Sequence, residues 1–342
     1  MNLEARIQAF ALLGKKIQGL SSGEKEKLYE KATQLNPWFT PASIDLSFNG
    51  IAHLLNEKNL SAWASGYTLS TEKEKKVGVA MAGNIPLVGF HDYLCVLLSG
   101  NQLVAKLSSQ DPFLLTEIHS WLIDIEPQFE NKIHFEERLK NVDAIIATGS
   151  DNTARYFEYY FRNLPHIIRK NRSSCAILMG EESTDHLMEF GQDVFSYFGL
   201  GCRNVSKLYV PEGYAFDTLL KTWEPYKAIA DHHKYANNYW YQKSIMLMDQ
   251  IPFLDNGFVI LTQKEQLVSP ISVVYYETYK DQADLKQKLE IQKDKIQCMV
   301  SANGWFEGSV PFGKAQMPEL WDYADGIDTM RFLGKLFSLR VA

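Results

Sequence analysis

The apolar run Val77-Gly78-Val79-Ala80-Met81-Ala82 has the length and composition of a buried β-strand. Two similar runs follow it, over residues 102–107 and 142–148, and apolar helical patterns lie between and after these runs. Strands that alternate with helices are joined by crossover connections and pair in parallel. This part of the chain therefore predicts an α/β unit with a mostly parallel sheet.

A second alternating set of helices and strands follows downstream. Its expected helices cover 185–198, 214–223 and 281–291, and its expected strands cover 205–210, 258–261, 271–276 and 296–301. The sequence thus predicts an α/β fold in which residues 1–180 form N-terminal helices and a dinucleotide-binding domain, and residues 181–312 form a second α/β domain. We expect residues 313–342 to form a C-terminal tail that returns to the first domain.

Composition limits the class of protein. With 342 residues, of which 46% are hydrophobic and 22% charged, the chain has the make-up of a soluble globular protein. Its net charge of −6 argues against a nucleic-acid partner, because phosphate binding needs a basic surface. No signal-peptide pattern follows Met1, and no apolar run reaches the roughly 18 residues of a membrane span. We therefore expect a cytoplasmic protein.

The four cysteines are Cys95, Cys175, Cys202 and Cys298, and their wide spacing suggests neither a disulfide framework nor a zinc site. Cys202 differs from the others because it lies in Phe198-Gly-Leu-Gly-Cys-Arg-Asn204, a glycine turn between an expected helix and strand. Glycine permits positive φ and close backbone approach to a substrate. A thiol there could present a nucleophile and its own N–H to one carbonyl group. The alternative is a small buried side chain, as most free cysteines are.

Four short motifs occur in one order along the chain. They are Ala82-Gly83-Asn84-Ile85-Pro86-Leu87, Val104-Ala105-Lys106-Leu107-Ser108, Ala147-Thr148-Gly149-Ser150 with Ala154-Arg155, and Gly199-Leu200-Gly201-Cys202-Arg203. Together they resemble the aldehyde dehydrogenase superfamily, most closely its LuxC-like acyl-CoA reductase branch. The resemblance implies an aldehyde-dehydrogenase-like fold, with a Rossmann-like cofactor domain and a second α/β catalytic domain that carries the cysteine.

The resemblance also implies which residues do the chemistry. In the family, the asparagine of the first motif and the N–H of the nucleophilic cysteine form the oxyanion hole, and these roles fall here on Asn84 and Cys202. Asn84 ends an expected strand, and ligands of α/β sheets bind at the carboxyl ends of strands. A capping asparagine is the alternative. Pro86 is expected to open the next helix.

A nicotinamide cofactor is implied as well. Lys106 stands where the family holds the adenosine ribose, with Ser108 nearby, and the corner Thr148-Gly149-Ser150 suits the pyrophosphate because it leads into a helix amino terminus. Gln266 is the nearest match to the family glutamate that contacts the nicotinamide ribose. Relatives that prefer NAD often have a glutamate just beyond the lysine, and residues 107–110 have none, which favours NADPH over NADH. An exposed lysine and a plain strand–turn–helix corner are the alternatives.

One departure from the family narrows the reaction. Hydrolytic members carry a glutamate in a Glu-Leu-Gly-Gly motif that activates water, whereas the matching stretch here, Arg169-Lys170-Asn171-Arg172, has no carboxylate. A similar loss marks relatives that exchange acyl groups with coenzyme A. The resemblance therefore implies NADPH-dependent reduction of a fatty acyl-CoA or acyl-protein thioester to an aldehyde, through an acyl-cysteine. The basic stretch is either an anion site or a solvated turn.

Two other functions stay open, namely an acyl-phosphate reductase of the semialdehyde-forming type and a non-catalytic cofactor-binding scaffold. Family habit alone suggests a homo-oligomer. No metal site is expected, since His232-His233 has no third ligand at metal spacing. We interpret these histidines as a surface pair, with protonation of a departing thiolate by one of them or by His166 as the alternative. An aromatic cluster suits core or dimer packing, or the wall of an acyl channel: it comprises Tyr235, Tyr239, Trp240 and Tyr241.

Overall fold

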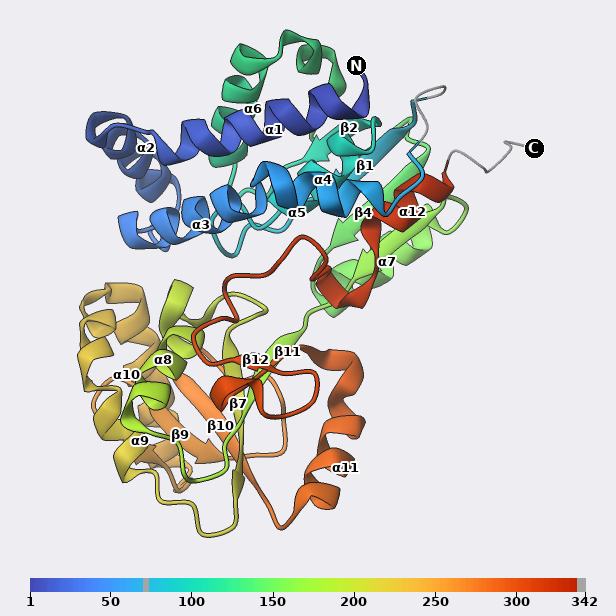
Figure 1. Ribbon diagram of the computed structural model, residues 1–342. Coiled ribbons are helices and arrows are strands. Elements are labelled where there is room, and N and C mark those ends of the chain that lie inside the picture. The colour runs from blue at the N-terminus through green and yellow to red at the C-terminus, as the bar shows by residue number, and fades with distance from the viewer. Residues whose placement is uncertain (70–73, 337–342) are drawn as a thin grey trace. The chain divides into compact units, whose positions relative to one another are not determined.

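The computed structural model describes residues 1–69 and 74–336, and residues 70–73 and 337–342 lie outside the described part of the chain. The chain divides into two units (Figure 1). The first comprises Met1–Asn171 with the described residues from Pro318 on, and the second comprises Arg172–Met317. Each unit has its own sheet with helices packed on it, so the expected α/β fold is confirmed.

The sheet of the first unit has the order β3-β2-β1-β4-β5 and is parallel throughout. Its strands are β1 (Lys76–Ala80), β2 (Gln102–Lys106), β3 (Ile133–Phe135), β4 (Ala144–Thr148) and β5 (His166–Arg169). Strand β5 was not expected, because polar residues at both of its ends interrupt the apolar pattern. Since all five strands run the same way, the loops that follow them gather along one edge.

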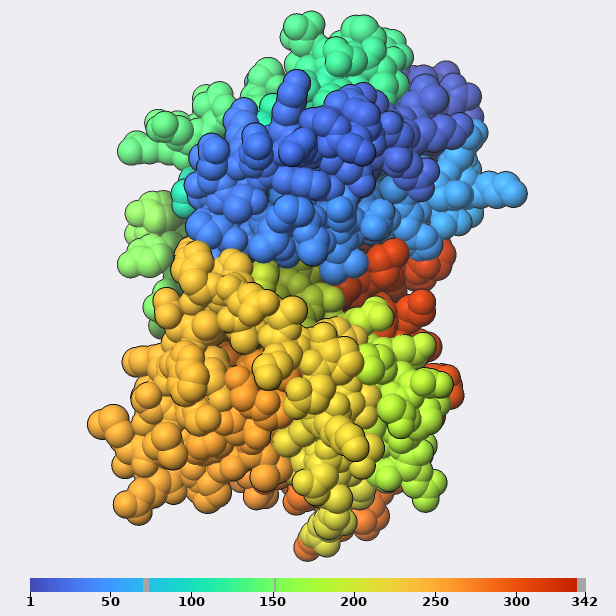
Figure 2. Space-filling model, turned by 90° about the vertical axis from the view of Figure 1, so that its left-hand side faces the viewer, coloured from blue at the N-terminus to red at the C-terminus, as the bar shows by residue number. Residues whose placement is uncertain are grey.

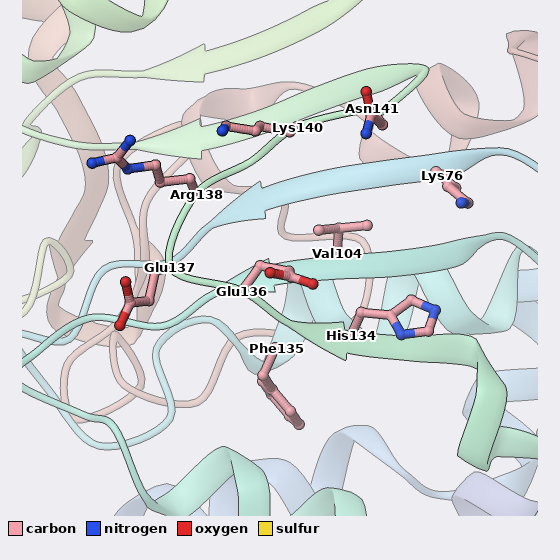
Figure 3. A pocket seen from close by; sticks show the side chains of 9 residues that line it. All are labelled: Lys76, Val104, His134, Phe135, Glu136, Glu137, Arg138, Lys140 and Asn141. Atoms are coloured by element: carbon pink, nitrogen blue, oxygen red, sulfur yellow. The ribbon is translucent and has the colours of Figure 1, made fainter.

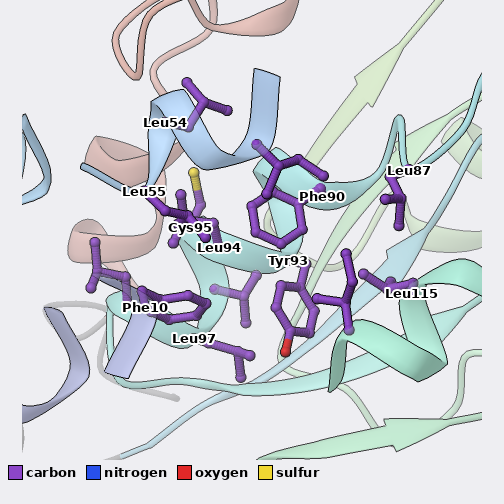
Figure 4. Close-up of a cluster of buried hydrophobic side chains, with 14 of the residues drawn as sticks. Phe10, Leu54, Leu55, Leu87, Phe90, Tyr93, Leu94, Cys95, Leu97 and Leu115 are labelled. Carbon is purple, nitrogen blue, oxygen red and sulfur yellow. The ribbon is translucent and has the colours of Figure 1, made fainter. Parts of the chain in front are cut away.

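Helices of the amino-terminal region cover one face of this sheet. They are α1 (Leu3–Gln18), α2 (Ser22–Leu35), α3 (Pro41–Leu54) and α4 (Glu57–Ser65), joined by α5 (Phe90–Leu98), α6 (Leu114–Ile125) and the 3₁₀ helix η1 (Pro127–Lys132). Side chains such as Phe10, Tyr93 and Leu94 are buried in the core beneath them (Figure 4). Figure 2 shows the outer surface of this helical layer in blue.

The opposite face of the sheet is covered over β4 by α7 (Asp151–Phe161), whose Phe157 and Phe161 pack against Ile145 and Ala147. The segment from Pro318 on includes the 3₁₀ helix η6 (Ala324–Gly326) and α12 (Thr329–Lys335), and it also belongs to this unit. For example, the Leu320 carbonyl lies 3.0 Å from the His91 ring. Residues 337–342 of the expected tail lie outside the described part of the chain.

The expected helix start at Pro86 is wrong. Helix α5 begins at Phe90, and residues 84–89 form turns instead. Leu87 has a φ of 58°, which a helix cannot contain, and its N–H donates to Asp111 at 2.8 Å. The Pro86 carbonyl accepts from Ser47 at 2.8 Å. These tertiary hydrogen bonds hold the chain in a turn where the local sequence favoured a helix.

The second unit has a seven-stranded sheet of order β12-β11-β6-β7-β10-β9-β8, parallel except for the pair β8–β9. Its strands are β6 (Ser173–Ile177), β7 (Val205–Pro211), β8 (Leu254–Asp255), β9 (Ile260–Gln263), β10 (Val273–Tyr279), β11 (Ile296–Ser301) and β12 (Val310–Pro311). Strand β6 falls within the range 1–180 expected for the first domain, but it pairs with β7 and β11, and the change of unit lies at Asn171–Arg172. No strand was expected over the residues of β6, and the sheet that a strand joins depends on pairing with residues distant in sequence.

Helices lie on both faces of this second sheet (Figure 1). They are α8 (Thr184–Phe195), α9 (Asp217–Thr222), α10 (His233–Met248) and α11 (Gln282–Gln292), with the 3₁₀ helices η2 (Ser196–Gly199), η3 (Glu224–Asp231), η4 (Lys293–Lys295) and η5 (Ala302–Gly304). The largest core of the unit packs Phe190 and Phe195 of α8 against Trp223 and Phe258. Helix α8 is thus fixed immediately before the turn that carries Cys202.

The buried pair of His119 and Tyr93 makes the stability of the first unit depend on pH. The Tyr93 hydroxyl lies 3.0 Å from His119 Nδ1, and burial lowers the pKa of His119 to about 4. In the unfolded chain the pKa returns to about 6.5, so stability is lost as pH falls between these values, by at most about 3 kcal/mol. We expect His119→Gln, which cannot titrate, to lose less stability than the wild type between pH 7 and pH 4.5 in urea unfolding. Parallel losses in the two proteins would contradict this.

Candidate functional site

The candidate site residues belong to both units. Cys202 and Gln266 belong to the second unit. Asn84, Lys106, Ser108 and the corner Thr148–Ser150 belong to the first.

The turn that carries Cys202 is more tightly wound than the sequence indicates. Helix α8 ends at Phe195 and not at Phe198, and the next residues reverse the chain in the left-handed region. Tyr197, Phe198 and Gly199 have φ values of 51°, 59° and 77°. Only the glycine adopts this conformation without cost, whereas each aromatic residue stores about 1–3 kcal/mol of strain. The expectation of a positive φ is therefore met at Gly199. Because Tyr197 and Phe198 are strained, other residues must hold the turn in this conformation.

The side chain of Asn204, only 2% exposed, supplies that restraint. Its Oδ1 accepts from the Gly201 N–H at 2.8 Å, and its Nδ2 donates to the Ser196 carbonyl at 2.8 Å. Longer bonds join Nδ2 to the carbonyls of Asp193 and Val194. One carboxamide thus ties the end of α8 to both sides of the turn. The sequence analysis missed this role, although an asparagine between a cysteine and an apolar strand is an available signal.

Ser174, at the start of β6, holds the other side of the turn, and Ser173 lies beside it. Ser174 Oγ donates to the Cys202 carbonyl at 3.0 Å, and the Ser174 N–H donates to the Asn204 carbonyl at 3.3 Å. Ser173 Oγ lies 3.4 Å from the same Asn204 carbonyl. The backbone around Cys202 is therefore fixed on both sides by buried polar groups, which stabilise a single conformation of the turn.

Exposure separates Cys202 from the other three cysteines. Cys202 is partly exposed, whereas Cys95, Cys175 and Cys298 are buried. Burial raises the pKa of the Cys95 and Cys175 thiols, so these two have little thiolate at neutral pH. The interpretation of Cys202 as a small buried side chain is therefore wrong. Among the four cysteines, the partly exposed one therefore lies on the strained turn.

Gln266 is exposed on the loop between β9 and β10, and strand β7 holds that loop. Ser206 Oγ donates to the Leu267 carbonyl at 2.7 Å, and Lys207 Nζ donates to the Lys264 carbonyl. Lys207 is fully buried, and Glu277 lies 2.9 Å from its Nζ. Since β7 begins three residues after Cys202, the Gln266 loop and the cysteine turn are attached to the same strand.

In the first unit, three loops meet at the carboxyl edge of the sheet. The loop after β1 carries Asn84, and the loop after β2 packs against it: a Cβ on Gly83 would lie 2.6 Å from Ser108 Oγ, so only glycine fits there. Asp111, only 7% exposed, accepts from the Leu87 and Leu114 N–H groups. Its carboxylate is therefore engaged in holding the turn that carries Asn84.

Lys106 and the corner Thr148–Ser150 lie two strands apart on that edge. Lys106 pairs with Ala80 on β1, and Ala80 pairs with Ala147 on β4, so their backbones are separated by roughly 10 Å. Lys106 is exposed, and Ser150 caps α7 by accepting from the Thr153 N–H. The Gly149 N–H donates to the Arg169 carbonyl at 3.2 Å. This N–H group is therefore already bonded within the protein, and the pyrophosphate role of the corner stays a prediction.

A pocket of about 720 Å³ lies on this sheet, beside the connection from β3 to β4 (Figure 3). This connection, residues 136–143, is too short for the helix that usually joins parallel strands. Three cations and two carboxylates line the pocket: Lys76, Arg138, Lys140, Glu136 and Glu137. Val104, His134 and Asn141 contribute the rest of the lining shown in Figure 3, and Phe135 completes it.

Within the basic stretch 169–172, Arg169 is not available to bind an anion. Arg169 is 4% exposed and pairs with Asp92 of α5, and it also donates to Thr329 of α12 at 2.9 Å. Lys170 pairs with Glu158, and Arg172 donates to the Ile296 carbonyl. Both interpretations of the stretch, as an anion site and as a solvated turn, are therefore wrong for Arg169.

The remaining candidates are the histidines and the aromatic cluster of α10. The His232 ring lies 4.5 Å from the Phe198 ring and 5.2 Å from the His233 ring, so the pair packs beside the cysteine turn. His166 is exposed. Among the aromatic residues of α10, Tyr235 and Tyr239 are buried, as core packing requires, whereas Trp240 and Tyr241 are exposed.

Within residues 1–69 and 74–336, no cluster of three or more His, Cys, Asp or Glu side chains could hold a metal ion. None of the helices in the same ranges has the length and apolarity that crossing a bilayer requires.

Comparison with solved structures identifies the fold. An NAD⁺ complex of aldehyde dehydrogenase from Bacillus cereus superposes with a TM-score of 0.62 at 13% identity, covering 88% of this chain and 72% of that one. A putative aldehyde dehydrogenase from Burkholderia cenocepacia gives a TM-score of 0.64 at 14% identity, covering 93% and 76%. An E. coli NADP-dependent enzyme gives 0.65 at 11% identity, covering 88% and 73%. The fold is that of the aldehyde dehydrogenases.

Sequence relatives point to one branch. A long-chain acyl-protein thioester reductase of Photorhabdus laumondii is 22% identical over 179 residues, covering 47% of this chain and 36% of the relative. Its counterpart from Aliivibrio fischeri is 28% identical over 101 residues, covering 25% and 21%. The matches thus span about a third or less of these relatives, and no family model matches the chain. The resemblance to the LuxC-like branch, inferred from four motifs, is confirmed.

The Asn204 network predicts a local effect on the cysteine turn. Asn204→Leu keeps the shape of the side chain but leaves the Gly201 N–H and the Ser196 carbonyl without their partner. We expect a loss of about 3 kcal/mol in the free energy of unfolding and faster hydrogen exchange at the Gly201 amide.

Asn256→Leu is the matched control, because Asn256 joins the Leu220 carbonyl to the N–H groups of Phe258 and Val259 in another loop. It should also destabilise the protein but leave exchange at Gly201 unchanged. Equal exchange at Gly201 in both variants and the wild type would contradict the role of Asn204.

Proposed function

Because the chain has the fold of the aldehyde dehydrogenases, we propose that it reduces an acyl thioester to an aldehyde with a nicotinamide cofactor, through an acyl group carried on Cys202. The observation that carries this proposal is the partly exposed thiol of Cys202 on a strained turn that buried polar groups hold rigid. A long-chain acyl thioester, as fatty acyl-CoA or as an acyl-protein thioester, is the proposed substrate, in line with the printed names of the two relatives.

In the proposed reaction, the Cys202 sulfur attacks the carbonyl carbon of the thioester. The Cys202 N–H and the Asn84 carboxamide donate to the oxygen as it becomes negative, and one such donor is worth about 3–4 kcal/mol. The carbon–sulfur bond of the substrate then breaks, and the departing thiolate takes up a proton. Cys202 is left as a thioester, ready for reduction.

The residues of the first unit fit a dinucleotide cofactor. Lys106, Ser108 and Ser150 are polar groups at one sheet edge, where the amino end of α7 favours an anionic group. We assign the adenosine ribose to Lys106 and Ser108, the pyrophosphate to the start of α7, and the nicotinamide ribose to Gln266. When bound, the cofactor supplies a hydride to the acyl carbon. Cys202 then releases the aldehyde and regains its proton.

The lack of a water-activating carboxylate favours reduction over hydrolysis. Hydrolytic relatives use a glutamate where this chain has the stretch Arg169–Arg172. Arg169 is buried against Asp92 and Thr329, so its side chain can neither activate water nor bind a substrate anion. An acyl group on Cys202 would therefore persist until a hydride or another thiol reaches it.

Acyl transfer to Cys202 can be tested without cofactor. Incubation with long-chain acyl-CoA should add one acyl group to the wild-type protein, as seen by intact mass and peptide mapping, and none to Cys202→Ala. Cys298→Ala is the matched control and should be acylated normally, because Cys298 is buried. NADPH consumption with acyl phosphate but not acyl-CoA would favour the acyl-phosphate reductase. No adduct from either class of acyl donor, with cofactor binding intact, would favour the scaffold.

We propose NADPH as the preferred cofactor. Residues 107–110 hold no carboxylate, and the next one along the chain, Asp111, is engaged with backbone N–H groups. A 2′-phosphate beside Lys106 would therefore meet little repulsion. The pocket on the sheet of the first unit holds Arg138 and Lys140 together with Glu136 and Glu137, so it adds little net charge.

This preference predicts the effect of a single added charge. Ser109→Glu should shift the ratio of kcat/KM for NADPH over NADH toward NADH by about tenfold or more, because it puts a carboxylate beside the 2′ position. Ser120→Glu, the same change at an exposed position of α6, should leave the ratio unchanged. A wild-type enzyme that already prefers NADH would contradict the proposal.

A further inference from the structure

Two hydroxyl groups, those of Ser173 and Ser206, lie between the cysteine turn and the Gln266 loop. Ser173 Oγ and Ser206 Oγ are 2.6 Å apart, and Ser206 Oγ donates to the Leu267 carbonyl at 2.7 Å. A serine hydroxyl has one proton to donate. Since Ser206 gives its proton to Leu267, Ser173 must be the donor between the two serines. The chain of bonds thus runs in one direction, from Ser173 through Ser206 to Leu267.

The first end of this chain belongs to the cysteine turn. Ser173 is 5% exposed and its Oγ lies 3.4 Å from the Asn204 carbonyl. Its neighbour Ser174 is fully buried and donates to the carbonyls of Cys202 and Asn204. The other end belongs to the loop that carries Gln266. Two neighbouring residues of β7, Ser206 and Lys207, therefore bind the carbonyls on either side of Gln266.

We propose that Ser206 is a positioning residue for the reduction step. It fixes the loop that carries Gln266 relative to the turn that carries Cys202, and this inference rests on the proposed function. Hydride transfer requires donor and acceptor carbons within a few tenths of an ångström of the productive distance, whereas attack by the thiol depends on the turn alone. The Ser206 hydroxyl should thus matter for reduction of the acyl-cysteine but not for its formation.

The space around Ser206 allows the effect of its hydroxyl group to be separated from the effect of side-chain size. Ser206 lines a cavity of about 30 Å³ together with Gly199, Tyr235 and Ser269. This is room for one methyl group, so threonine and valine should both fit at this strand position. Threonine keeps the hydroxyl, whereas valine has the same shape without it. Ser206→Thr and Ser206→Val are therefore a matched pair.

The experiment separates the two steps in the full-length protein. Acylation by acyl-CoA without cofactor is followed by intact mass, and the acyl-enzyme is then mixed with NADPH in a single-turnover measurement of cofactor oxidation. We expect Ser206→Val to be acylated at the wild-type rate but reduced about tenfold more slowly, and Ser206→Thr to match the wild type in both steps. Ser173→Ala removes the hydroxyl that donates to Ser206, and because Ser174 keeps its bonds to the cysteine turn, this variant should also slow only reduction.

Ser309→Val is the control for loss of a paired hydroxyl, because Ser309 and Ser301 form a similar pair at 2.7 Å beside β11, and it should match the wild type in both steps. Reduction by Ser206→Val at the wild-type rate, equal slowing of both steps, or slowing by Ser206→Thr as well would each overturn the inference. If Ser206→Val does not fold, Ser173→Ala decides in the same way. Failure of the wild type to form an acyl-cysteine would instead refute the proposed function.

Discussion

The hydrogen bonds of one buried carboxamide, that of Asn204, are the interaction on which the cysteine turn depends. Two aromatic residues, Tyr197 and Phe198, are held in a left-handed conformation that isolated residues of this kind avoid. The carboxamide offsets this cost by satisfying the Gly201 N–H and the last carbonyls of α8. Without it, the turn would have unpaired polar groups in a buried setting as well as backbone strain.

Strand β7 connects the cysteine turn to the rest of the second unit. The strand begins three residues after Cys202 and pairs with β6 and β10 in the middle of the sheet. Its first residues reach Ser173 on one side and the Gln266 loop on the other. Buried Lys207 also forms an ion pair with Glu277. Losing either partner would leave the other charge buried without compensation, which would destabilise the protein. The proposed nucleophile and the loop proposed to contact the cofactor are thus both attached to a central strand of one sheet.

In the first unit, the parallel direction of the five strands determines which residues lie together. Because every strand ends at the same edge, Asn84, Lys106 and the corner at Thr148 come together there although they are far apart in sequence. Local contacts then adjust this edge. Hydrogen bonds to Asp111 and Ser47 hold the chain after Asn84 in a turn instead of a helix. Arg169 is buried because it pairs with Asp92.

The sequence by itself determined the α/β fold and the order of the motifs, and it distinguished Cys202 as the candidate nucleophile, because apolar strand runs and short motifs are local signals. It did not reveal that Arg169 is buried, that α5 starts at Phe90, or that the Gly149 N–H is already bonded. Each of these depends on a partner distant in sequence. Only the tertiary structure revealed the hydrogen-bond partners of Asn204, Ser173 and Ser206, because a hydrogen-bonded polar side chain and an exposed one look alike in sequence until their partners are placed around them.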